Sequence, residues 1–177
     1  MKFILSAVLL ALGMSLVQAA PPSADELIAE AGKKAASGKK NIYVHFGASW
    51  CGWCKKHDAF LEQTAVKSVF EKYFVPVKLV VGEAEKNKDL ENPGSEDWLK
   101  KIGGPEGLPF SAFLDAKGGL IVNSKRAGDP QTPGRNIGHP MDAGEIDWFV
   151  GMMKKAAPMM TAEDLKVIDS ALRSQKK

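Results

Sequence analysis

The two cysteines of this chain stand three positions apart, in the segment Trp50-Cys51-Gly52-Trp53-Cys54. They directly follow a strand-like run, Asn41 to Gly47, and directly precede a helix-like run, Lys55 to Val66. A cysteine at the start of a helix lies where unpaired N–H groups and the helix dipole favour an anion, here a thiolate. Such a position lowers the pKa of a thiol from about 8.5 to roughly 3.5–7.5 and makes the sulfur nucleophilic at neutral pH. The spacing therefore predicts a redox-active dithiol.

The first 19 residues have the pattern of a secretory signal peptide. Lys2 supplies a positive charge, Phe3 to Val17 is apolar, and Val17-Gln18-Ala19 offers small residues for cleavage. The apolar part is short of the roughly 20 residues that a transmembrane helix needs. We expect cleavage after Ala19, a single domain over residues 20–177 without a membrane span, and a periplasmic or secreted location, with a bacterial source.

Charge and cysteine content narrow the class of function. The chain has 24 Lys and Arg against 21 Asp and Glu, which gives no basis for binding nucleic acid. A disulfide that only stabilises a fold usually closes a longer loop than this pair would close. One closely spaced pair in an exported chain therefore indicates a working dithiol.

Periodicity and capping signals predict alternating helices and strands. Ser23 and Glu26 form a capping box, and so do Asp142 and Glu145. We expect Ser95 to cap a short helix. The run Phe74 to Val81 is almost continuously apolar, as is typical of a strand covered on both faces. We expect helices over 24–36, 55–73, 95–102, 142–156 and 161–174, strands over 41–46, 74–81, 110–114 and 120–123, and a loop over 127–140. This order predicts an α/β domain with parallel early strands and an antiparallel late pair.

The segment from Phe46 to Lys55, followed much later by Gly107-Leu108-Pro109 before a hairpin, resembles the thioredoxin family. It is most similar to exported thioredoxin-like proteins related to the carboxy-terminal domain of bacterial thiol:disulfide interchange proteins. The similarity spans roughly Lys40 to Ala156. It implies a thioredoxin fold, in which helices flank a central mixed sheet, here with an extra C-terminal helix. It also implies a thiol–disulfide oxidoreductase without a cofactor, acting on protein thiols and disulfides and exchanging electrons with a second redox protein.

The resemblance also implies the roles of individual residues. Cys51, at the helix start and expected to be the more exposed of the two, would be the attacking sulfur, and Cys54 the resolving one. Trp50 and Trp53 would contact partner proteins. Pro109 matches the family's cis-proline, which places the backbone of Leu108 against a bound peptide.

His45 stands where the family carries a buried acid, six positions before Cys51. Two interpretations remain open at this stage: a base that accepts the proton of Cys54, for which an unperturbed pKa near 6.5 is suitable, or a neutral histidine that fills the core. Without the acid, Lys78 is left with no predicted ion pair. We expect His57 and His139 at the surface.

Two other functions compete with catalysis. The chain could be a non-catalytic binding module that keeps the fold, or a metallochaperone that uses the two thiols. A zinc site needs four ligands, and only His57 lies near the cysteines in sequence. The pairs Met152-Met153 and Met159-Met160 could suggest copper, but methionines near a helix end are more typical of a core. We therefore predict no bound metal.

Overall fold

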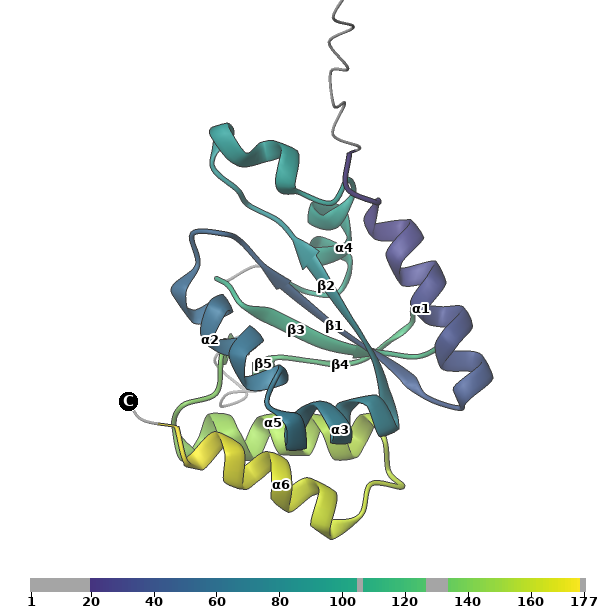
Figure 1. The fold of residues 1–177 in the computed structure, drawn as a ribbon, viewed down its shortest axis with the longest axis vertical. Helices are drawn as coiled ribbons and strands as arrows, with labels where there is room; N and C mark the ends of the chain where they lie inside the picture. Colours follow the sequence, from purple (N-terminus) through teal and green to yellow (C-terminus); the bar gives the residue numbers. More distant parts are fainter. Residues whose placement is uncertain (1–19, 105–106, 127–133, 176–177) are drawn as a thin grey trace, which may run out of the picture.

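The computed structural model describes residues 20–104, 107–126 and 134–175 (Figure 1). The predicted signal peptide, residues 1–19, lies outside the described residues. The elements, in chain order, are α1 (Ala24–Gly38), β1 (Asn41–Gly47), α2 (Gly52–Leu61), α3 (Thr64–Tyr73), β2 (Phe74–Val80), the 3-10 helix η1 (Glu85–Leu90), α4 (Ser95–Lys101), β3 (Phe110–Leu114), β4 (Leu120–Asn123), β5 (Lys125–Arg126), β6 (Arg135–Asn136), α5 (Ala143–Ala156) and α6 (Ala162–Arg173).

The main sheet has the order β2-β1-β3-β4. β1 runs parallel to β2 and antiparallel to β3, and β4 pairs antiparallel with β3. The predicted mixed sheet with parallel early strands and an antiparallel late pair is therefore confirmed. β1 lies between two other strands, which explains why residues 42–47 are all buried.

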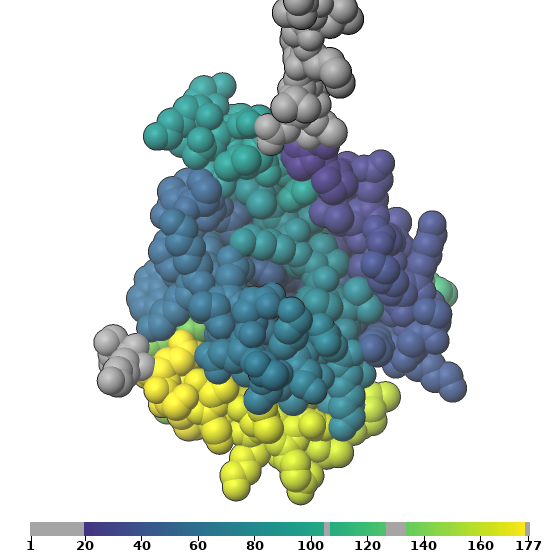
Figure 2. Space-filling model, in the orientation of Figure 1, coloured from purple at the N-terminus to yellow at the C-terminus, as the bar shows by residue number. Residues whose placement is uncertain are grey.

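Alternate residues of β1 enter two different apolar cores. Ile42, Val44 and Phe46 pack with residues of α1 and α4 on one face of the sheet. Tyr43 packs with residues of α2, α3, α5 and α6 on the other face. The sheet is thus covered on both sides, and α6, the predicted extra helix, lies along α3 and α5 (Figures 1 and 2). In this arrangement one face of α2, with Cys54, His57 and Phe60, is buried.

The predicted capping boxes are both present. The Ser23 hydroxyl accepts the Glu26 N–H at the start of α1, and the Asp142 carboxylate accepts the Glu145 N–H at the start of α5. Such caps satisfy N–H groups that have no partner within the helix. These helix starts are local properties, so the sequence alone locates them.

Four details differ from expectation. The helix predicted over 55–73 is two helices, because Gln63 adopts an extended conformation between α2 and α3. β2 is an edge strand whose Pro76 and Lys78 are exposed, so it is not covered on both faces. Gly94, not Ser95, caps α4. The predicted 127–140 loop contains β6, which pairs with β5, while its residues 127–133 lie outside the described residues.

Candidate functional site

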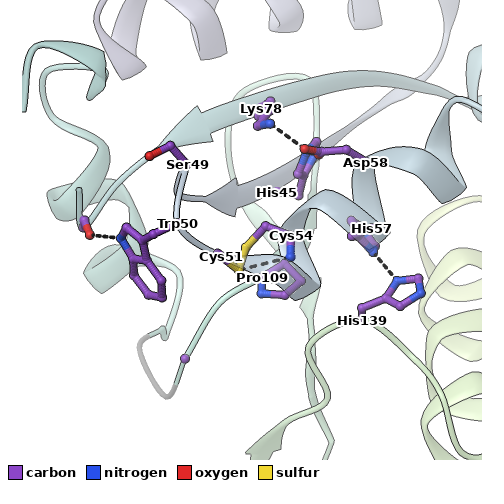
Figure 3. The surroundings of a disulfide bond; sticks show 12 residues. His45, Ser49, Trp50, Cys51, Cys54, His57, Asp58, Lys78, Pro109 and His139 are labelled. Carbon is purple, nitrogen blue, oxygen red and sulfur yellow. Dashed lines mark hydrogen bonds and ion pairs between the residues drawn. A yellow bond between two sulfur atoms is a disulfide. The ribbon is translucent and has the colours of Figure 1, made fainter. Parts of the chain in front are cut away.

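The cysteine pair lies at the N-terminus of α2, as predicted. Cys51 is the N-cap residue, and its Sγ accepts the N–H of Cys54 at 3.1 Å. The two sulfurs form a disulfide of 2.03 Å (Figure 3). Cys51 was expected to be the more exposed sulfur, yet both residues are nearly buried, at 4% and 2% exposure. β1 passes close beneath them, since a Cβ added at Gly47 would lie 3.2 Å from the Cβ of Cys54.

The loop before the disulfide is anchored to the segment that follows β2. The Ser49 hydroxyl donates to the Glu83 carboxylate at 2.7 Å, and the Ser49 N–H donates to the same carboxylate. The Trp50 indole N–H donates to the Gly82 carbonyl at 2.8 Å (Figure 3). The Trp50 ring itself stays 61% exposed, and Trp53 is 53% exposed. Two large aromatic surfaces therefore flank the disulfide, where a partner protein can contact them.

The segment before β3 lies against the cysteines. The Leu108–Pro109 peptide bond is cis, as the resemblance implied. Leu108 packs against the small cluster of Ala48, Cys51 and Cys54. The Asn136 side-chain amide donates to the carbonyls of Gly107 and Pro109, at 2.9 and 3.1 Å. β6 thus holds both ends of this short segment beside the disulfide.

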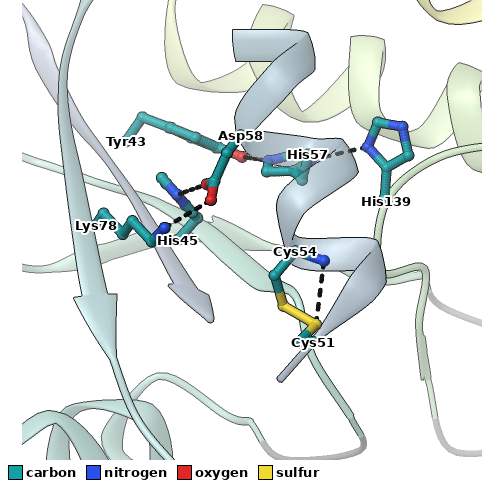
Figure 4. Close-up of polar contacts among 8 residues, drawn as sticks. All are labelled: Tyr43, His45, Cys51, Cys54, His57, Asp58, Lys78 and His139. Atoms are coloured by element: carbon teal, nitrogen blue, oxygen red, sulfur yellow. Dashed lines mark hydrogen bonds and ion pairs between the residues drawn. A yellow bond between two sulfur atoms is a disulfide. The ribbon is translucent and has the colours of Figure 1, made fainter. Parts of the chain in front are cut away.

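Behind Cys54, His45 belongs to a chain of three polar side chains (Figure 4). Its Nε2 lies 3.0 Å from Oδ1 of Asp58, and Oδ2 of Asp58 lies 2.6 Å from Nζ of Lys78. Lys78 is next to His45 in the parallel register of β1 and β2. The expectation that Lys78 has no ion pair is therefore wrong, because α2 supplies the carboxylate that β1 lacks.

The Asp58 carboxylate determines the tautomer of His45. The lysine and histidine hydrogen bonds outweigh burial and lower the pKa of Asp58 to about 2. An ionised carboxylate only accepts hydrogen bonds, so the Nε2 of His45 carries the hydrogen. The lone pair of a neutral His45 is then on Nδ1, which is buried and has no hydrogen-bond partner among the described residues. The ring presents an unoccupied basic nitrogen in the core beside α2.

A second polar chain contains the other two histidines (Figure 4). The Tyr43 hydroxyl lies 2.6 Å from Nε2 of His57, and the two Nδ1 atoms of His57 and His139 are 3.0 Å apart. Nε2 of His139 meets the side-chain oxygen of Gln175, just beyond α6. With that oxygen as acceptor, His139 donates to Gln175, His57 donates to His139, and Tyr43 donates to His57. In this arrangement the imidazole rings of His57 and His139 are both neutral.

The prediction that His57 and His139 lie at the surface is wrong. His57 has no exposed surface and His139 is 4% exposed. Phe60 and Phe149 pack against the His57 ring, and Trp53 stacks on His139. Burial is the main cause that lowers the pKa of both histidines; nearby cationic groups add to it, while the hydrogen bond from His139 to Gln175 opposes it.

We expect the folded protein to lose stability as the pH falls below about 6.5, the pKa of an unperturbed histidine. His57 and His139 have lowered pKa values in the fold, so the unfolded chain binds protons that the folded chain does not. Each such proton costs about 1.4 kcal/mol per pH unit. Urea unfolding at pH 7.5, 6.5 and 5.5 measures this loss, which should precede the loss due to Asp58 at lower pH. Equal unfolding midpoints at the three values would contradict the neutral histidine pair.

Asp58 and the buried histidines are the residues that sequence reasoning missed. For Asp58 a signal was available, because it follows Cys54 by four positions and a helix places such residues on one face. For His139 no local signal exists, since it follows a Pro- and Gly-rich segment of the kind that usually forms surface loops.

Within residues 20–104, 107–126 and 134–175, no group of three or more His, Cys, Asp or Glu side chains is arranged to hold a metal ion. Met152, Met153 and Met160 are buried in the core between the sheet and the C-terminal helices. No helix in this part of the chain is long and apolar enough to span a membrane.

Comparison with known proteins identifies the family and the fold. The model of a thioredoxin-like family matches residues 25–116. A disulphide isomerase from Xylella fastidiosa Temecula1 superposes with a TM-score of 0.51 and 18% identity, over 89% of this chain and 95% of that one. The oxidised DsbD c-terminal domain of Neisseria meningitidis gives a TM-score of 0.43 and 20% identity, over 76% and 99% of the two chains. A search of the curated proteins finds no match. The family match and the isomerase superposition confirm the predicted fold.

Proposed function

Because this chain belongs to the thioredoxin-like family, we propose that it is an exported thiol–disulfide oxidoreductase that exchanges disulfides with protein substrates. The observation that carries the proposal is the Cys51–Cys54 disulfide at the N-terminus of α2, with an unoccupied histidine nitrogen in the core behind it. The charge pattern of residues 1–19 supports export. The partners are protein thiols and disulfides, together with a second redox protein that restores the starting state.

In the first step the reduced protein attacks a substrate disulfide through Cys51. The thiolate forms a bond to one substrate sulfur, the substrate S–S bond breaks, and the second substrate sulfur leaves as a thiolate. The N-terminus of α2 stabilises the Cys51 thiolate through the dipole and through the Cys54 N–H, which already points at Sγ. Trp50, Trp53 and the backbone of Leu108 hold the substrate at this position.

In the second step Cys54 attacks the Cys51 sulfur of the mixed disulfide. A bond forms between Cys51 and Cys54, the bond from Cys51 to the substrate breaks, and the substrate leaves as a second thiolate. Cys54 is buried and must first lose its proton. His45 accepts that proton at Nδ1, because Nε2 is occupied by its hydrogen bond to Asp58.

Asp58 positions His45 and stabilises the imidazolium that forms, in the way that the carboxylate orients the histidine of a Ser-His-Asp triad. Lys78 keeps the Asp58 carboxylate ionised from the solvent side. A pocket of about 350 Å³ that His45, Asp58 and Lys78 help to line connects this chain to the surface. The proton can then pass from His45 to water.

The protein lacking residues 1–19 tests the proposal directly. With dithiothreitol as electron source it should accelerate the reduction of insulin disulfides, followed by the turbidity of the released chains. We expect a rate well above that of dithiothreitol alone. Equal rates with and without the protein would contradict the proposed activity. Stoichiometric zinc or copper in the protein isolated under reducing conditions would favour a metallochaperone instead.

A further inference from the structure

Two pockets lie on either side of the Gly107–Leu108 segment. The first, of about 420 Å³, is lined by Trp53, Arg126 and Arg135 among others, and we call it the Trp53 pocket. The second, of about 440 Å³, is lined by Trp50, Val81 and Leu99 among others, and we call it the Trp50 pocket. Gly107 and Leu108 line both. A peptide that crosses Leu108 with its cysteine at Cys51 therefore has one flank over each pocket.

The charged residues of the Trp50 pocket are paired with one another. Lys88 lies 2.9 Å from Glu91, and Lys100 lies 2.9 Å from Glu96. What remains is an apolar surface formed by the ring of Trp50 with Val81, Leu99 and Leu108. This side of the disulfide fits an apolar side chain.

The Trp53 pocket has a different charge arrangement. Arg126 and Arg135 are directly opposite each other in the ladder between β5 and β6, and both side chains are exposed and line the pocket. Like charges directly opposite each other destabilise a strand pair. Among the residues that the structure describes, neither guanidinium has a carboxylate within ion-pair distance. Two planar donors without a partner form a site that suits a carboxylate.

The two acidic residues of the same pocket are engaged by the backbone. The Asp142 carboxylate accepts the Glu145 N–H at 2.8 Å, and the Glu145 carboxylate accepts the N–H groups of Met141 and Asp142. They cap α5 and offset its positive end. The Arg126 guanidinium lies against this first turn at Gly144. A side chain at Gly144 would collide with it, since an added Cβ would lie 2.4 Å from a guanidinium nitrogen of Arg126.

We propose that the substrate of this protein is a segment whose reactive cysteine has an apolar residue on the Trp50 side and an acidic residue on the Trp53 side. Arg126 and Arg135 bind the carboxylate of that residue. The proposal rests on the proposed oxidoreductase function and adds the substrate class.

A peptide series tests the substrate class. Each peptide has one cysteine joined by a disulfide to an aromatic thiol whose release is coloured. Attack by the Cys51 thiolate joins Cys51 to the peptide sulfur and expels the aromatic thiolate, and Cys54 then releases the peptide thiol. The flanks carry leucine on one side and aspartate, asparagine or lysine on the other, in both orders. The rate of colour release is measured at low and high salt.

At low salt, the aspartate peptide with its flanks in one of the two orders should react about 3–10-fold faster than the asparagine peptide with the same order. The factor is modest because exposed charge contacts are individually weak. The lysine peptide should be the slowest, and high salt should reduce the differences. In the double variant Arg126→Gln, Arg135→Gln the ratio of aspartate to asparagine rates should fall to about one. The control Lys33→Gln removes one positive charge from α1, on the other face of the sheet, and should keep the wild-type ratio.

Two failures are distinguishable. Equal rates for aspartate and asparagine peptides in the wild type, or an unchanged ratio in the double arginine variant, would overturn the substrate class alone. An asparagine peptide that reacts no faster with the wild type than with Cys51→Ser would overturn the proposed oxidoreductase function as well.

Discussion

Replacing Cys51 with serine is expected to reduce insulin reduction to the rate of dithiothreitol alone. A serine hydroxyl is not ionised at neutral pH at a helix N-terminus, so the variant has no nucleophile at the position where α2 stabilises an anion. Cys54 cannot replace it, because Cys54 lies one turn inside the helix, against Gly47, and not at the N-cap position where the helix dipole stabilises a thiolate. The measurement is insulin turbidity with wild type and variant at equal concentration.

The Cys54→Ser variant is the matched control for this experiment. It keeps the Cys51 nucleophile and removes only the sulfur that resolves the mixed disulfide. We expect one round of reaction and an accumulating mixed disulfide with the substrate, visible on a non-reducing gel. Wild-type turnover by Cys51→Ser would place the chemistry at another site.

Replacing His45 with alanine should slow the resolution of a preformed Cys51 mixed disulfide. The variant removes the basic nitrogen that receives the Cys54 proton. General bases accelerate a step by roughly 10²–10⁴-fold, so the rate of resolution should fall by that factor at most. The fall is smaller where Cys54 passes its proton directly to solvent. The initial attack by Cys51 does not involve this proton and should change far less. Stopped-flow measurement of both steps between pH 5.5 and 8.5 separates them.

The Asp58→Asn variant tests how much of this loss in resolution rate depends on the carboxylate beside His45. It keeps the shape of the side chain, removes the charge that stabilises the imidazolium, and leaves both histidine tautomers possible. We expect a smaller loss in the second step than for His45→Ala, with a shifted pH profile. Equal resolution rates for wild type and His45→Ala across the pH range would leave His45 as a residue that only fills the core.

Local chemistry accounts for what the sequence could predict. The capping residues Ser23 and Asp142, the position of Cys51 at the start of α2, and the strand β3 all depend on neighbours within a few positions. Alternation along β1 likewise puts Tyr43 and His45 on the face of the sheet opposite to that of Ile42, Val44 and Phe46. Such features need no knowledge of the distant chain.

The polar contacts behind the disulfide depend on packing between distant segments. His57 follows Lys55 and Lys56 in a stretch that reads as a solvated helix face, yet α5 and the segment before it cover the ring. Asp58 reaches His45 and Lys78 only because α2 crosses β1 and β2 at that level. The family's carboxylate was therefore expected to be lost, whereas α2 supplies one from another position.

The rate at which each single-cysteine variant captures a small aromatic disulfide at pH 7 tests the central claim most directly. If the N-terminus of α2 makes Cys51 the nucleophile, Cys54→Ser should react at least about tenfold faster than Cys51→Ser, because the N-cap position favours the Cys51 thiolate and Cys54 lies one turn inside the helix. Equal rates for the two variants, or faster capture by Cys51→Ser, would contradict the account.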